Sequence, residues 1–135
     1  IPMDRDDHWM EWAEYASMAS THPKIHIGAA IVKGNWLVAT GSNKIKSHPR
    51  QFRYNEKYRT FDHQNHHLHA EIDALIKSGR DDIVGADVYV YRQDRNGLLA
   101  MCKPCHVCHA ALRDAGIKRV VYTTPQGLEE YYIES

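Results

Sequence analysis

The chain has 135 residues, 43% of them hydrophobic and 25% charged, as expected for one globular domain with a single core. Seventeen basic residues balance seventeen acidic ones, which argues against a strong sequence-independent grip on nucleic acid, because such binding needs clustered Lys and Arg. No apolar run approaches the roughly 20 residues that cross a bilayer, and no export signal is evident. We expect one domain over residues 1–135, with Ile1 and Pro2 as remnants of cloning ahead of Met3.

The first part of the chain predicts a helix followed by a hairpin. Aromatic and small apolar residues recur near a helical period from residue 4 to about residue 22, and Pro23 ends this helix. Residues 25–32 and 36–40 predict two strands joined by a tight turn. The first strand contains small residues at 28–30, which allow a helix or a ligand to approach closely.

The stretch from residue 44 to residue 68 is the least regular part of the sequence. Basic residues alternate there with aromatic ones, and no clear period emerges. A connection of this length in a compact domain is usually a functional loop, unless it contains an element that the pattern does not reveal.

The second half predicts alternating helices and strands. In order, we expect a helix, a strand, a helix, a strand and a short element of either type, at residues 69–78, 86–91, 105–115, 119–123 and 128–133. Gly79 and Gly116 fit the ends of the two helices. Strands connected through helices predict an α/β fold of three α/β/α layers around a central mixed sheet of about five strands.

Two short motifs begin the two helices of the second half. His69-Ala70-Glu71 offers an imidazole, and Pro104-Cys105-His106-Val107-Cys108 offers two thiols one helical turn apart. Together, His69, Cys105 and Cys108 are three zinc ligands, which leaves a tetrahedral ion one position for water. Glu71 is the candidate catalytic residue, because a carboxylate beside such a water can transfer its protons.

Each motif also has an ordinary interpretation. His69 and Glu71 alone fit an exposed helix start, and Cys105 and Cys108 alone fit a redox pair or half of a structural zinc site. The two motifs occur in the right order, and a second C-x-x-C pair made of cysteines other than Cys105 and Cys108, which a closed site would need, is absent. We therefore expect one catalytic zinc ion, in a protein of a reducing compartment such as the cytoplasm.

A second metal site is not expected. Further histidines and a third cysteine lie near the motifs, but their spacing fits no particular coordination geometry. These residues are His63, His66, His67, Cys102 and His106.

The H-x-E…P-C-x-x-C pattern is the signature of zinc-dependent nucleobase deaminases. The chain resembles the cytidine/deoxycytidylate deaminase superfamily over nearly its whole length, through residues 28–32, 41–43, 69–71 and 115–122 around and between the motifs. The resemblance implies a cytidine deaminase-like fold, substrate contacts from Asn43 and from the backbone of Ala70 and Glu71, and assembly into a homo-oligomer.

Within the superfamily, the chain is most similar to deoxycytidylate (dCMP) deaminases of cells and phages, which share the stretch Ala115–Tyr122, and its brevity hints at a phage or other viral source. The implied reaction is hydrolysis of dCMP to dUMP and ammonia, in the cytoplasm of a cell or of a viral host. Residues 41–44, Gly-Ser-Asn-Lys, differ from the Gly-Tyr-Asn-Gly of many of these enzymes. Lys44 and Arg53 could replace the usual phosphate contacts, or could belong to a solvated loop.

Two alternatives stay open from the sequence. A deaminase acting on a base in single-stranded DNA, RNA or tRNA would use aromatic residues between the basic ones for stacking. However, the residues after Cys108 and the long preceding loop differ from those of tRNA adenosine deaminases. The other alternative is a zinc-binding module without catalytic activity. A small-molecule nucleotide substrate and no membrane partner are our expectation.

Overall fold

The computed structural model describes residues 5–57, 67–79 and 83–133. In the described ranges no helix is long and apolar enough to span a membrane. The elements, in chain order, are α1 (Arg5–Ser17), β1 (His26–Lys33), β2 (Trp36–Ser42), β3 (Lys44–Ser47), α2 (Pro49–Lys57), β4 (His67–Leu68), α3 (Ala70–Lys77), β5 (Asp87–Gln93), α4 (His106–Asp114), β6 (Arg119–Thr124) and β7 (Gly127–Tyr132).

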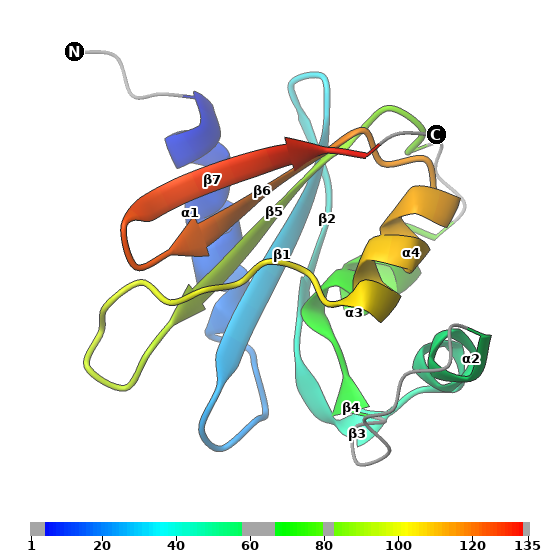
Figure 1. Ribbon diagram of the computed structural model, residues 1–135, viewed down its shortest axis with the longest axis horizontal. Helices are drawn as coiled ribbons and strands as arrows, with labels where there is room; N and C mark the ends of the chain where they lie inside the picture. The colour runs from blue at the N-terminus through cyan, green and yellow to red at the C-terminus, as the bar shows by residue number, and fades with distance from the viewer. Residues whose placement is uncertain (1–4, 58–66, 80–82, 134–135) are drawn as a thin grey trace.

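A five-stranded mixed sheet forms the centre of the molecule, as the sequence predicted (Figure 1). Its strand order is β2-β1-β5-β6-β7. β1 runs antiparallel to both of its neighbours, β5 and β6 are parallel, and β7 returns antiparallel to β6. The parallel pair requires a crossover connection, and α4 supplies it.

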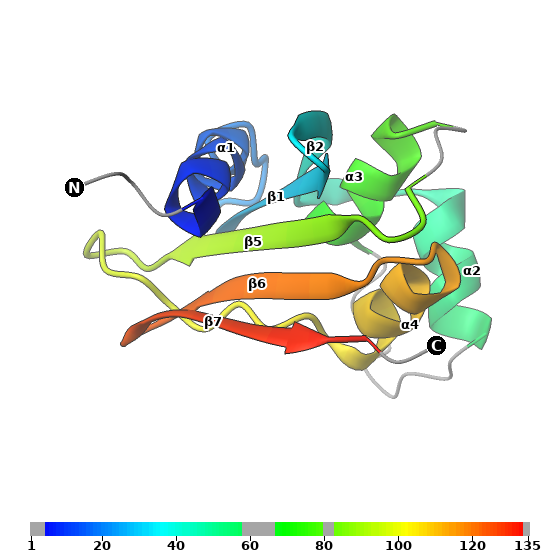
Figure 2. The ribbon, with the colours of Figure 1, turned by 90° about the horizontal axis from the view of Figure 1, so that it is seen from above.

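The alternation of side chains along the strands divides the core into two layers. Ala29 and Ile31 of β1 pack with residues of α3 and α4, whereas Ala30 and Val32 pack with Met10 and other residues of α1. Figure 2 shows the same separation, with α1 on one face of the sheet and α3 and α4 on the other. The predicted three-layer α/β/α arrangement is therefore confirmed.

Two glycines allow helices to approach the sheet at backbone distance. A Cβ atom on Gly28 would lie 1.9 Å from the carbonyl oxygen of Ala13 in α1. On the opposite face, a Cβ atom on Gly41 would lie 2.3 Å from the backbone nitrogen of Ala74 in α3. The close approach predicted at residues 28–30 is thus the approach of a helix.

The first helix ends earlier than the sequence predicted. α1 stops at Ser17, several residues before His22 and Pro23. Ser17 donates its hydroxyl hydrogen to the carbonyl oxygen of Glu14 at 2.5 Å, and the N–H of Ser20 donates to the carbonyl of Ser17 at 3.1 Å. The chain therefore tightens into three-residue turns before proline can act.

The irregular stretch 44–68 contains a helix and two short strands that the sequence did not reveal. α2 begins at Pro49, a residue suited to the first helical position, and the His48 imidazole accepts the N–H of Arg50 at 3.0 Å. Its buried residues are the amides Gln51 and Asn55. β3 and β4 pair beside it. The short element expected at residues 128–133 is the edge strand β7.

Replacement of Gly41 by alanine should destabilise the protein by about 3 kcal/mol, the upper part of the usual range for overpacking, because the added Cβ meets backbone atoms that cannot rotate away. Urea unfolding measures this change. The matched control is Thr40→Ala in the same strand, which should cost less than about 1 kcal/mol. Equal stability of Gly41→Ala and the wild-type protein would contradict the backbone contact between β2 and α3.

Candidate metal centre

The residues of the two motifs lie at the starts of two neighbouring helices. His69 is the N-cap of α3, with φ −80° and ψ 151°, and Cys105 is the N-cap of α4, with φ −67° and ψ 170°. Extended backbone at an N-cap turns the side chain toward the helix end. The Cys105 sulfur accepts the N–H of Cys108 at 3.5 Å, so it also caps α4.

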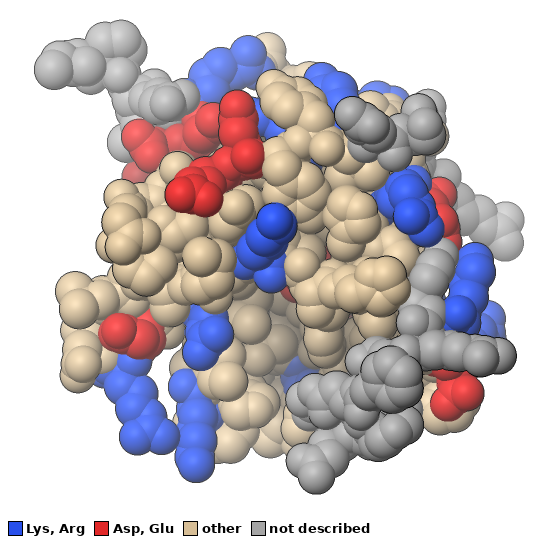
Figure 3. All heavy atoms as spheres, in the orientation of Figure 1, with Lys and Arg blue, Asp and Glu red and all other residues tan. Residues whose placement is uncertain are grey.

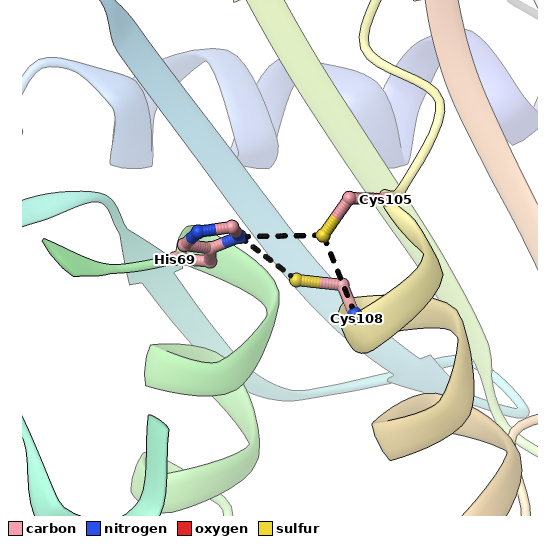
Figure 4. Close-up of side chains that lie close together, drawn as sticks. All are labelled: His69, Cys105 and Cys108. Carbon is pink, nitrogen blue, oxygen red and sulfur yellow. Dashed lines mark hydrogen bonds between the residues drawn. The ribbon is translucent and has the colours of Figure 1, made fainter. Parts of the chain in front are cut away.

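Three potential ligand atoms converge between these helices (Figure 4). The Nδ1 atom of His69 lies 3.1 Å from the Cys108 sulfur and 3.6 Å from the Cys105 sulfur. All three atoms lie within 4.8 Å of one another. A tetrahedral zinc ion with Zn–S distances of about 2.3 Å and a Zn–N distance of about 2.0 Å separates its ligands by about 3.5 Å, so the donor set and its spacing fit zinc.

The two sulfurs are free thiols and are not joined in a disulfide. A hydrogen bond from Cys108 lowers the pKa of Cys105 to about 4. The same interaction raises the pKa of Cys108, because the two sulfurs share a proton. A thiolate at the start of a helix is further favoured by the helix dipole, and such a thiolate is ready to bind a cation.

Glu71 lies in the first turn of α3, two residues after the His69 ligand. Its side chain is buried, with a 6% exposed fraction for the residue. Burial raises the pKa of the Glu71 carboxyl, and the nearby His69 opposes this shift. A carboxyl with a raised pKa can both accept and return a proton near neutral pH.

A cavity of about 250 Å³ adjoins this group of residues. Figure 3, in the orientation of Figure 1, shows a hollow near the centre of the molecule with basic side chains near its edge. Apolar, amide, imidazole and charged residues line the cavity: His22, Ile25, Ile27, Asn43, His67, Leu68, His69, Ala70, Glu71, Arg92, Met101, Cys102, Lys103 and Cys105.

The substrate-binding candidates from the sequence divide into two groups. Asn43 and Ala70 line the cavity. The amide of Asn43 also holds β1, since its Oδ1 accepts the N–H of Ile27 at 3.0 Å and its Nδ2 donates to the carbonyl of Ile25 at 2.9 Å. A contact from Asn43 to a sugar stays a prediction, and it would use the second hydrogen or lone pair of this amide.

Lys44 and Arg53 are not among the described residues that line the cavity. The Lys44 ammonium donates to the Ser42 hydroxyl at 2.6 Å and to the carbonyl of Ala19 at 3.1 Å. Arg53 is an exposed residue of α2. Of the residues considered for a second metal site, His63 and His66 lie outside the described residues, and His67 and Cys102 are in the cavity wall.

The cavity contains cationic residues that sequence reasoning missed. Arg92 comes from the end of β5 and Lys103 from the segment before α4. His22 also lines the cavity, and its Nδ1 accepts the N–H groups of Lys24 and Ile25, which places the proton of the neutral ring on Nε2. The position of Lys103 next to Pro104 was a usable signal, but Arg92 had none.

Comparison with known proteins agrees with this geometry. The model of the family described as "Cytidine and deoxycytidylate deaminase zinc-binding region" matches residues 3–124. The deoxycytidylate deaminase of Mycobacterium phage D29 is 28% identical over 130 residues, covering 88% of this chain and 94% of that protein. The deoxycytidylate deaminase of Schizosaccharomyces pombe is 30% identical over 135 residues, but 93% of this chain corresponds to only 39% of that protein.

A tRNA-specific adenosine deaminase of Buchnera aphidicola is also similar, with 29% identity over 120 residues, 88% of this chain and 66% of that protein. Among solved structures, the apo dCMP deaminase of cyanophage S-TIM5 superposes with a TM-score of 0.62 and 25% identity over 89% of this chain and 84% of that one. The cytidine deaminase of Burkholderia pseudomallei shares the fold, with a TM-score of 0.66 and 19% identity over 96% and 93% of the two chains. The family match covers most of the sequence, including both motifs, and the chain therefore belongs to the zinc-dependent cytidine and deoxycytidylate deaminase family.

Proposed function

We propose that the protein catalyses the hydrolytic deamination of a cytosine nucleotide, dCMP in the first place, to give dUMP and ammonia. One observation carries this proposal. The buried carboxyl of Glu71 lines the same cavity as His69 and Cys105, two of the three potential zinc ligands. The similarity to dCMP deaminases of a phage and a yeast supports the choice of substrate.

The roles of the residues follow from their chemistry. His69, Cys105 and Cys108 would hold zinc, a Lewis acid that would lower the pKa of a water molecule to about 7. Glu71 accepts a proton from the attacking water and delivers it to N3 of the ring. The carboxyl then transfers the second water proton to the departing amino group, so that a carbonyl remains at C4 and ammonia leaves.

The charge of the cavity supports a substrate that carries a phosphate. Arg92 and Lys103 belong to its wall, and the Arg92 guanidinium can form two parallel hydrogen bonds to phosphate oxygens. These two residues are better placed for this contact than Lys44 and Arg53, which the sequence suggested. A neutral nucleoside would leave both cations without a partner from the substrate.

A deaminase that acts on adenosine in tRNA is the second candidate, because a tRNA-specific adenosine deaminase shows comparable identity. The balanced charge of the chain favours the mononucleotide, since RNA binding needs cations along an extended surface. A zinc-binding module without activity is disfavoured, because such a module has no need for a buried carboxyl beside the ligand group.

We further propose that residues 1–135 act as one deaminase domain in a homo-oligomer. Trp12 and Tyr15 of α1 and Met18 directly after it are exposed and recur every third residue, which favours contact with another copy. The three free cysteines favour a reducing compartment such as the cytoplasm.

Glu71→Gln should lower kcat for dCMP by about 10²–10⁴-fold, because an amide cannot transfer the protons. Zinc content and thermal unfolding should stay unchanged, since the amide occupies the same buried volume. Ammonia release and elemental analysis measure these two effects. Glu11→Gln, the same chemical change on the exposed face of α1, is the control and should keep full activity. Full turnover by Glu71→Gln would overturn the proposed mechanism.

Comparison of substrates tests the chemical class. Deoxycytidine, dCMP, dCTP, a cytosine-containing single-stranded oligonucleotide and an adenosine-containing tRNA are each incubated with the zinc-loaded protein. We expect kcat/KM to be highest for dCMP, because the cavity offers two cationic residues to a single phosphate. Turnover of the tRNA alone would establish the second candidate, and turnover of none of the five would support the module without activity.

Arg92→Met should raise KM for dCMP by about 10–100-fold, which corresponds to the loss of a charge-assisted hydrogen bond of about 1.5–3 kcal/mol. The effect on deoxycytidine should be small, because the nucleoside has no phosphate. Steady-state kinetics with both substrates measure the difference. Arg95→Met, a change in the exposed turn after β5, is the matched control. An equal loss with both substrates would exclude a phosphate contact from Arg92.

A further inference from the structure

Helix α2 reaches the metal centre through one buried side chain. Gln51 is fully buried, with a 0% exposed fraction, although glutamine is normally a surface residue. Its Oε1 accepts the backbone N–H of His69 at 3.0 Å. The contact joins α2 to the residue whose imidazole faces the two cysteine sulfurs.

The backbone N–H of His69 needs a partner from outside α3. His69 is the N-cap of α3, so its N–H precedes the helix and has no acceptor within it. A partly buried N–H without an acceptor would be costly, and the backbone at His69 would shift to find one. Gln51 removes this cost and fixes the direction in which the imidazole leaves the chain.

The orientation of the Gln51 amide is itself determined by a neighbour. Its Nε2 donates to Oδ1 of Asn55, one helical turn further along α2, at 3.0 Å. Asn55 is also buried, with a 5% exposed fraction. The oxygen of Gln51 must therefore face His69, because the nitrogen is already committed to Asn55.

Helix α2 lies against both helices that carry the ligands. Besides the contact with His69, the Lys57 ammonium at its end lies 3.5 Å from the Asp114 carboxylate of α4. Both side chains of this pair are substantially exposed, so it contributes little to stability. The buried contact through Gln51 is the one that can transmit position to the metal centre.

We propose that Gln51 is a positioning residue for zinc, which holds His69 in the orientation that brings Nδ1 to the cysteine sulfurs. Hydrogen bonds to metal ligands from outside the coordination sphere commonly change metal affinity by about 10–100-fold when they are removed. The inference concerns the zinc site alone, so its test does not depend on which substrate the enzyme uses.

The test compares zinc affinities of variants by competition with a chromogenic chelator. Gln51→Met keeps the volume but removes the acceptor, and Gln51→Ala removes it while opening space. Each should bind zinc about 10–100-fold more weakly than the wild-type protein. Gln51→Glu keeps an oxygen that accepts the His69 N–H, and its affinity should stay within about fivefold of wild type, a difference of about 1 kcal/mol.

A destabilised variant with an intact site is the matched control. Val32→Ala deletes buried methyl groups on the opposite face of the sheet, against α1, and should lower stability without changing zinc affinity. Urea unfolding of the metal-free proteins shows how much of each effect is general destabilisation. Three results overturn the proposal: wild-type affinity in Gln51→Met or Gln51→Ala, a tenfold loss in Gln51→Glu, or an equal loss of affinity in Val32→Ala.

Discussion

The structure depends on the convergence of two helix starts on one face of the sheet. α3 and α4 each begin with a potential ligand at the N-cap, and the second sulfur follows one turn into α4. The positive ends of both helix dipoles meet at this point. Such a place favours thiolates and other anions, and the hydrogen bonds from Cys108 and His69 lower the pKa of Cys105 to about 4 even before a cation is considered. The metal centre is therefore a consequence of how the helices begin, more than of the individual side chains.

Close packing between α3 and β2 sets the position of this centre relative to the cavity. Gly41 lets the backbone of α3 lie directly against the strand. One residue later, the Ser42 N–H donates to the Asp73 carboxylate at 3.0 Å, and Lys77 also lies 3.0 Å from that carboxylate. Because Asp73 is buried, both contacts limit rotation of the helix about its axis. Glu71, half a turn earlier on the same helix, is consequently held at the cavity and can serve as a fixed proton acceptor.

Much of the fold and the ligand set could be predicted from the sequence, because both rest on local patterns. Strand β1 and helices α3 and α4 have clear apolar periods, and the ligands belong to two compact motifs. Helix α2 could not be predicted, because its buried face consists of the amides Gln51 and Asn55 and gives no apolar signal. Arg92 was missed for another reason. It lies far from both motifs in the sequence, and only the pairing of β5 within the sheet brings it to the cavity. The early end of α1 depended on hydroxyl and backbone contacts that composition does not encode.

The distribution of charge explains how a chain without net charge can be suited to an anionic substrate. Net charge governs attraction at long range, and at about 0.15 M salt this attraction is screened beyond about 8 Å. A single phosphate needs only one or two cations at a defined distance from the reacting ring, and Arg92 and Lys103 are both in the cavity wall. A polymer would need cations repeated along its whole path. Glu71 lines the same cavity, and burial raises the pKa of its carboxyl. The cavity must therefore provide cationic side chains for the phosphate and a desolvated carboxyl for the proton transfer. Cations at the wall and a carboxyl in the first turn of α3 satisfy both requirements, so the absence of net charge does not argue against the proposed mononucleotide substrate.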